Sequence, residues 1–159
     1  MDVGKMRKTI ISPSIEVVAF DVYGVILATT DEKAPRKGII RLLDEGTWEG
    51  LTFCTCSDAL TEDVLSGLNK ADINPRYFDN FFKMPRKGAN FNKQPKDFLP
   101  ILKYYNLLKE PNKLLVIGDR KERDINPALK LGCQAIHVPM YYKRSSNIDI
   151  NNYVKFLQK

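Results

Sequence analysis

Short apolar runs alternate with segments of helical hydrophobic spacing along most of this chain. Four runs are rich in Val, Ile and Phe and do not alternate strictly with polar residues: 15–20, 51–55, 113–117 and 135–138. Such runs are typical of strands that are buried on both faces, as in parallel sheets. The run 81–84 is a candidate for one further strand.

The segments between these runs place apolar residues three and four positions apart, which predicts helices. These predicted helices cover residues 58–68, 96–105 and 124–131, with a further one over the tail, 151–157. Strands that alternate with helices predict an α/β fold, a three-layer sandwich around a Rossmann-like central parallel sheet. No repeat, low-complexity tract or linker interrupts the pattern, so we predict a single domain over residues 1–159.

The composition excludes several classes of protein. The 159 residues are 43% hydrophobic and 28% charged, as in ordinary globular domains. No apolar run approaches the roughly 20 residues that a membrane helix needs, and no long apolar stretch precedes Pro13, so neither a membrane partner nor a secretory signal is expected. The three cysteines form no CxxC pair and there is one histidine, which argues against disulfides and zinc. We therefore expect a cytoplasmic protein.

The net charge of +6 favours anionic substrates, phosphates above all, although a lysine-rich solvated surface would give the same value. Nucleic acid is not indicated, because no helix-turn-helix signature, RNP-like aromatic pattern or dense basic tail is present.

Polar residues end three of the predicted strands. Asp21 follows the first, Thr55 ends the second, and Asp119 follows the third after Gly118. Ligands bind at the carboxyl ends of parallel strands, and a carboxylate directly after a buried strand is costly unless it has a partner. Two acids side by side repel unless a cation lies between them, and oxygen ligands suit Mg²⁺. Ser57 is the alternative to Thr55, since it lies two residues further along the same side of the strand.

Four motifs in this order resemble the haloacid dehalogenase-like (HAD) hydrolase superfamily over about residues 15–138. They are VVAFDVYGVIL, the strand LTFCT, the lysine-containing NKQPKDFLPIL, and LLVIGDRKERDINPALKLGCQAIHV with its Gly-Asp-x(4)-Asp pattern. The second and third motifs are weak alone, whereas the first and fourth at this separation are specific.

The resemblance implies a phosphatase with an aspartyl-phosphate intermediate. Asp21 would be the nucleophile, Thr55 (or Ser57) would hydrogen-bond the phosphoryl group, and Lys93 (or Lys87) would neutralise its charge. The reaction is an expectation that follows from the family, and Asp21, Thr55 and Lys93 are the residues at the matching positions of this sequence.

The resemblance also implies a Mg²⁺ site. Its ligands would be Asp21, Asp119 and the backbone carbonyl of Tyr23. Gly118, which directly precedes Asp119, would support the site. Asp124 would orient the catalytic lysine or a metal-bound water, although it could equally cap the helix that follows.

One departure from the family pattern concerns Tyr23. Phosphatases of the family carry a second Asp there, as general acid and base, and a phenol with a pKa near 10 is a poor base at pH 7. The Asp-x-Tyr form resembles the 2-haloacid dehalogenase branch, but those enzymes lack the Gly-Asp metal motif, which is intact here at Gly118 and Asp119. Activity could therefore be low or absent, which leaves a phosphate- or partner-binding protein as the alternative.

The spacing of the motifs leaves no room for a separate cap domain, since 34 positions separate Asp21 from Thr55 and 38 separate Thr55 from Lys93. We therefore expect an open site that acts on a phosphorylated substrate, small or macromolecular, and that a second copy of the chain could cover as a homo-oligomer.

Overall fold

The structure is a computed structural model, and it describes residues 9–11, 14–29, 34–85, 94–142 and 149–156. Its main sheet has five parallel strands in the order β4-β3-β2-β5-β6. These strands are β2 (Val17–Phe20), β3 (Thr52–Ser57), β4 (Phe78–Lys83), β5 (Leu114–Gly118) and β6 (Gln134–His137). The predicted α/β fold with a parallel, Rossmann-like sheet is confirmed.

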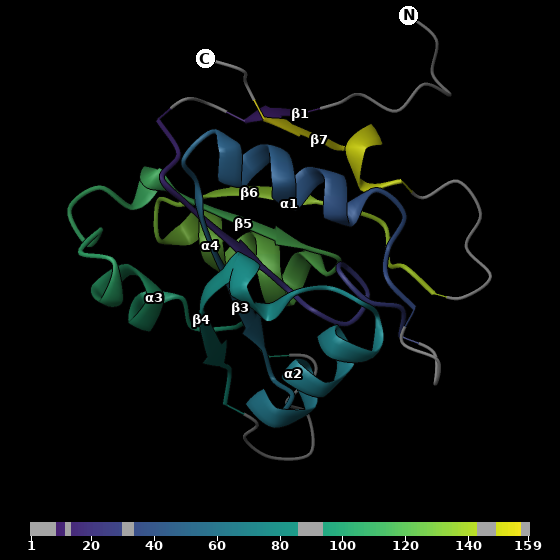
Figure 1. Cartoon of the computed structure of the whole chain (residues 1–159). Coiled ribbons are helices and arrows are strands. Elements are labelled where there is room, and N and C mark those ends of the chain that lie inside the picture. Colours follow the sequence, from purple (N-terminus) through teal and green to yellow (C-terminus); the bar gives the residue numbers. More distant parts are fainter. Residues whose placement is uncertain (1–8, 12–13, 30–33, 86–93, 143–148, 157–159) are drawn as a thin grey trace, which may run out of the picture.

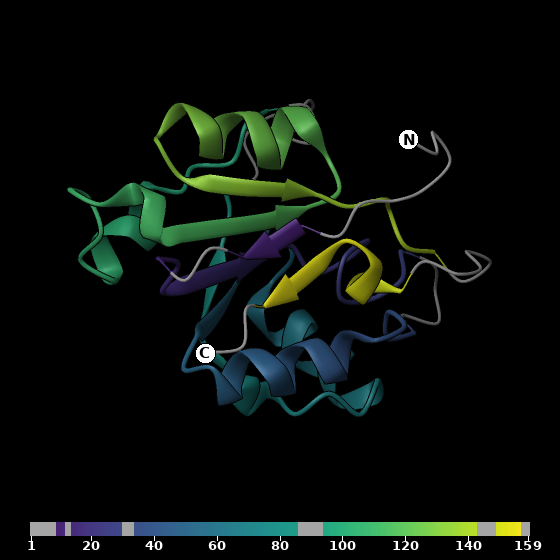
Figure 2. The same cartoon turned by 90° about the horizontal axis from the view of Figure 1, so that it is seen from above.

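Helices cover both faces of this sheet (Figure 2). On one face lie α1 (Ile39–Trp48) and α2 (Thr61–Lys70), and on the other α3 (Leu99–Tyr104) and α4 (Asn126–Lys130). Neighbouring strand residues point to opposite faces, so Phe20 packs in the core with α1 and α2, and Ala19 packs in the core with α3 and α4. The three-layer sandwich is therefore confirmed.

Short helical turns join several of these elements. They are the 3₁₀ turns η1 (Pro75–Tyr77), η3 (Pro111–Lys113) and η5 (Ile150–Asn152), and a π-helix, η4 (Lys121–Ile125). The helix predicted over 124–131 is in fact this π-helix followed by the shorter α4.

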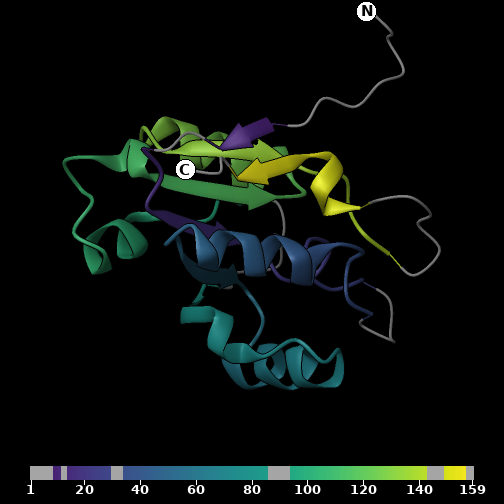
Figure 3. The ribbon, with the colours of Figure 1, turned by 45° about the horizontal axis from the view of Figure 1, so that its top comes forward.

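The tail differs from the prediction. The helix expected over 151–157 is wrong, because the chain there forms η5 and then strand β7 (Val154–Phe156). β7 pairs in parallel with β1 (Thr9–Ile11), and this two-stranded sheet lies beside α1 (Figures 1 and 3). Val154 is fully buried in the core that α1 covers, so contacts with distant residues select the strand. α1 itself has no counterpart among the predicted elements.

Two connections leave the carboxyl ends of β2 and β3. Within the described residues, the β2–β3 connection contains α1, the β3–β4 connection contains α2 and η1, and neither contains an additional domain. Among all the residues that the structure describes, no helix is long and apolar enough to cross a membrane.

Candidate active site

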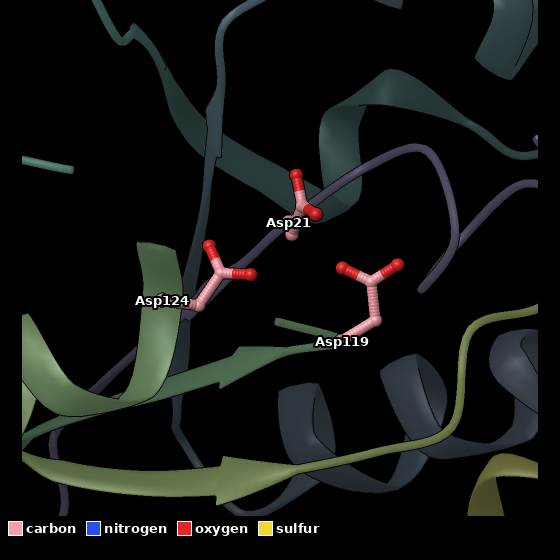
Figure 4. A group of neighbouring side chains, drawn as sticks. All are labelled: Asp21, Asp119 and Asp124. Atoms are coloured by element: carbon pink, nitrogen blue, oxygen red, sulfur yellow. The ribbon is translucent and has the colours of Figure 1, made fainter. Parts of the chain in front are cut away.

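Three aspartates meet at the carboxyl ends of β2 and β5. Asp21 follows β2, Asp119 follows β5, and Asp124 lies in η4. The backbone N–H of Asp21 donates to the carbonyl of Ile117 at 3.0 Å, which places Asp21 beside the end of β5. Each aspartate offers one oxygen, and these oxygens lie within 4.8 Å of one another (Figure 4). We call these three residues the carboxylate cluster.

A single ammonium group binds two members of the cluster. The Lys96 Nζ lies 3.0 Å from Asp21 Oδ1 and 2.8 Å from Asp124 Oδ1, and it donates to the carbonyl of Cys56 at 2.8 Å. The Lys96 side chain is only 3% exposed. Lys96 is not one of the lysines predicted from the sequence. The two predicted lysines, Lys93 and Lys87, lie outside the described residues.

β3 extends two residues beyond its predicted end, to Ser57. A cavity of about 140 Å³ opens here, and its lining includes Asp21, Tyr23, Ser57, Lys96, Asp119 and Arg120. We call it the site cavity. Thr55 is buried within β3 and is not among the described residues that line the cavity. Of the two candidate residues, Ser57, the alternative, is therefore the one that lines the cavity together with Asp21.

Asp119 lies in a close-fitting environment. Gly24 has a φ of +93°, and a Cβ added to it would lie 2.2 Å from Asp119 Oδ2. A ring nitrogen of His137 lies 3.0 Å from the backbone oxygen of Asp119. The other carboxyl oxygen, Oδ1, is buried and has no hydrogen-bond partner among the described residues. A buried carboxylate oxygen of this kind is suited to bind a cation.

Asp124 is held by the backbone around it. Its Oδ2 accepts a hydrogen bond from the backbone N–H of Arg120 at 3.2 Å, while its other oxygen faces Lys96. A Cβ on Gly118 would lie 2.4–2.6 Å from Asp124 side-chain atoms, so this position requires glycine. Asp124 lies inside η4, and α4 has no side-chain cap. The Asp124 carboxylate thus contacts Lys96 and the backbone N–H of Arg120, and it does not cap α4.

Burial governs the charges of the cluster. It raises the pKa of Asp21 to about 6, with Lys96 opposing this shift and Asp119 adding to it. Burial also raises the pKa of Asp119 and of Asp124. For Lys96, burial alone would lower the pKa, but Asp21 and the other neighbouring acids outweigh it and raise the pKa above its ordinary value. Two of the three carboxylates thus share one ammonium, and a divalent cation with oxygen ligands fits the remaining charge.

Tyr23 occupies the position of the expected general acid and base. Its hydroxyl donates to the backbone oxygen of Asp63 in α2 at 3.2 Å. Burial, and then Asp63, raise the pKa of the phenol above its ordinary value of 10. Tyr23 therefore lines the cavity as a neutral side chain that is poorly suited to proton transfer at pH 7.

No protein-family model and no curated protein sequence matches this chain. Solved structures do. An uncharacterized protein from Listeria monocytogenes has a TM-score of 0.63 and 17% identity, covering 90% of this chain and 91% of its own. A protein described as a β-phosphoglucomutase, from Thermotoga maritima, has a TM-score of 0.62 and 14% identity, with 91% and 94% covered. A third protein, described as a phosphoglycolate phosphatase, from Haemophilus somnus, has a TM-score of 0.58 and 12% identity. That match covers 90% of this chain and 94% of the other. At these identities the match shows a shared fold.

Proposed function

We propose, from its HAD-like fold and its carboxylate cluster, that this chain is a magnesium-dependent phosphatase that forms an aspartyl-phosphate on Asp21. The observation that carries the proposal is the meeting of three largely buried carboxylates beside one ammonium, which binds two of them. A buried carboxylate oxygen of the third, Asp119, has no hydrogen-bond partner among the described residues. Neutral packing does not explain such a cluster, because buried like charges are costly without a cation.

The carboxylate of Asp21 is oriented for attack. Its Oδ1 accepts from the backbone N–H of Val22 at 2.9 Å and from Lys96 at 3.0 Å, which leaves Oδ2 for the substrate. In the proposed first step, Oδ2 forms a bond to phosphorus. The bond from phosphorus to the ester oxygen then breaks, and the electron pair leaves with that oxygen. Lys96 and the Ser57 hydroxyl, which line the same cavity, would contact the phosphoryl oxygens.

Asp21 and Asp119, with the carbonyl of Tyr23, would hold Mg²⁺, which would neutralise charge on the phosphoryl oxygens. Asp124 would keep the Lys96 ammonium directed at Asp21, because it binds the same nitrogen at 2.8 Å.

The second step is expected to be slow. Release of phosphate requires water to attack the phosphorus, with a base to take its proton, and the Tyr23 hydroxyl is already donating to Asp63. Loss of a general acid and base typically costs 10²–10⁴-fold in rate. We therefore expect the aspartyl-phosphate to accumulate and turnover to be limited by its hydrolysis.

The test is release of 4-nitrophenol and of phosphate from 4-nitrophenyl phosphate, with Mg²⁺ and with EDTA. We expect metal-dependent turnover that Asp21→Asn lowers on the order of 10³-fold or more. Asp72→Asn is the control, an exposed aspartate outside the site cavity that should retain wild-type turnover. Undiminished turnover by Asp21→Asn would remove Asp21 from the role of nucleophile.

The position of the metal is tested separately by calorimetric titration with Mg²⁺. Asp119→Asn should weaken binding at least about tenfold. An unchanged affinity would rule out Asp119 as a ligand.

The hydrogen bond of Tyr23 also favours a second candidate, a phosphate-binding protein without turnover. In that case phosphate should bind in the presence of Mg²⁺, and neither the wild type nor Tyr23→Asp should release 4-nitrophenol. The dehalogenase alternative predicts metal-independent halide release from 2-chloropropionate.

A further inference from the structure

Arg120 combines a fixed backbone with an exposed side chain at the rim of the site cavity. Its N–H donates to Asp124 Oδ2 at 3.2 Å, and its carbonyl accepts from the N–H groups of Asp124 at 2.9 Å and Ile125 at 3.3 Å. It directly follows Asp119, and it lines the same cavity as Asp21 and Lys96. The backbone of Arg120 is therefore held in a set position relative to the carboxylate cluster.

The cations that line this cavity differ in their partners. Lys96 is bound to Asp21 and Asp124. Arg123 donates to Asp58 at 3.0 Å and to the carbonyl of Gln94 at 3.0 Å, with a side chain only 6% exposed. Within the described residues, the Arg120 guanidinium has neither an ion pair nor a hydrogen bond. Its charge and its donors are therefore available to a ligand in the cavity.

Depth in the cavity separates Arg120 from the reacting groups. Lys96 and Asp124 are buried and Asp21 is 14% exposed, so the phosphoryl group would lie at the bottom of the cavity. Arg120 is exposed and lines the same cavity, so it would face a part of the ligand that projects outward. A guanidinium presents a planar pair of donors that matches a carboxylate or phosphate group.

We propose that Arg120 is a specificity residue that binds a second anionic group in the organic part of the substrate. The substrate class is then a phosphomonoester that also carries a carboxylate or a further phosphate. This inference rests on the proposed phosphatase function and adds the substrate class to it.

The test compares two esters of nearly equal size that differ in charge, 4-carboxyphenyl phosphate and 4-carbamoylphenyl phosphate. The measured quantity is the ratio of their kcat/KM values, from phosphate release with Mg²⁺. Dividing the wild-type ratio by that of a variant cancels the different reactivity of the two leaving groups. Arg120→Gln should lower the ratio about tenfold, and Arg120→Lys should lower it less, because it keeps the charge and loses the planar fork.

Lys121→Gln is the matched control. Lys121 is the next residue, also an exposed cation, and it is not among the described residues that line the cavity. Its removal changes the net charge by the same amount, so it should leave the ratio unchanged. A ratio that falls equally in both variants would mean a general charge effect and would overturn the proposal.

Two other outcomes would also overturn it. If Arg120→Gln changes neither kcat/KM value, the residue does not contact the substrate. If both kcat/KM values fall equally, the ratio is also unchanged, and the residue contacts the phosphoryl group and not a second anionic group. Should the wild type hydrolyse neither ester, the phosphatase function fails, and the ratio is read from calorimetric Kd values. A carboxylate preference lost in Arg120→Gln would then support the rim site, and its absence would refute it.

Discussion

Replacement of Lys96 by Met tests the buried charge balance directly. Methionine keeps most of the length of the side chain and removes the ammonium that contacts Asp21, Asp124 and the carbonyl of Cys56. Removal of one partner from a buried ion pair costs about 3–5 kcal/mol, because the other partner stays buried and uncompensated. Two carboxylates and a carbonyl lose the ammonium here at once, so we expect a loss in the upper half of that range.

The assay is urea unfolding followed by circular dichroism at pH 7 without metal, with the free energy of unfolding as the result. A domain of this size has about 5–15 kcal/mol in total, so Lys96→Met could leave too little native protein to measure. Lys96→Met combined with Asp124→Asn relieves part of the repulsion. The double variant should be more stable than the sum of the two single losses implies, by about 2 kcal/mol or more.

The loss should also depend on pH. Lys96 lowers the pKa of Asp21, so its removal raises that pKa further above its ordinary value. The folded variant then takes up a proton on Asp21 at mildly acidic pH, and the cost of the substitution should be smaller at pH 5 than at pH 7. Lys121→Met serves as the exposed control, with an expected change within about 0.5 kcal/mol. A loss below about 1 kcal/mol at both pH values in Lys96→Met would refute the buried ion-pair arrangement.

Three further predictions concern neighbouring residues. Tyr23→Asp should supply the missing acid and base and raise steady-state turnover by about 10²-fold or more, with a smaller burst of 4-nitrophenol; a fall in turnover would contradict this reasoning. Gly24→Ala should destabilise the fold and weaken Mg²⁺ binding, because the new Cβ would lie 2.2 Å from Asp119 Oδ2. Gly50→Ala is the control: it has a similar φ of +83° but open space around it, so it introduces the backbone strain alone and should leave the Mg²⁺ affinity intact. Without metal, the free energy of unfolding should fall by up to about 3 kcal/mol as the pH rises from 4 to 6.5. Folding raises the pKa of Asp21 from 3.8 to about 6, so over this range the folded state holds the proton more tightly than the unfolded state does. Asp21→Asn should flatten this dependence on pH, and an equal slope in that variant would assign it to other groups.

The fold was largely predictable because its central strands, β2, β3 and β5, are buried on both faces. Apolar runs such as 15–20 and 113–117 are short and rich in Val, Ile and Phe, which is typical of strands in a parallel sheet covered by helices on both faces. The tail was not predictable in the same way. Its apolar residues fit a helix by spacing, but β7 has three residues and is selected by pairing with β1 and by burial of Val154. Those contacts are distant in sequence, so local spacing cannot reveal them.

The residues of the site also differ in how far the sequence alone could reveal them. Asp21 and Asp119 stand out in the sequence because each follows a buried strand, where a carboxylate has no packing role. Lys96 does not stand out, since Lys87 and Lys93 lie in the same stretch before the helix. What brings Lys96 inward is the path of the chain, set in part by its N–H donating to the carbonyl of Arg123 at 2.9 Å. Spacing between motifs cannot distinguish lysines three residues apart.

Electrostatics links the fold to the proposed chemistry. The parallel sheet brings Asp21 and Asp119 together, and η4 adds Asp124, so the carboxylate cluster carries more negative charge than its one ammonium neutralises. Asp21 and Asp124 share Lys96, while a buried oxygen of Asp119 has no described partner. Burial and, to a smaller extent, the charge of Asp119 raise the pKa of Asp21, and a divalent cation at Asp21 and Asp119 would oppose both effects. It would thereby keep Asp21 ionised as a nucleophile at neutral pH. Metal binding and nucleophile activation are thus expected to be one coupled event, and Mg²⁺ should stabilise the wild type more than Asp119→Asn.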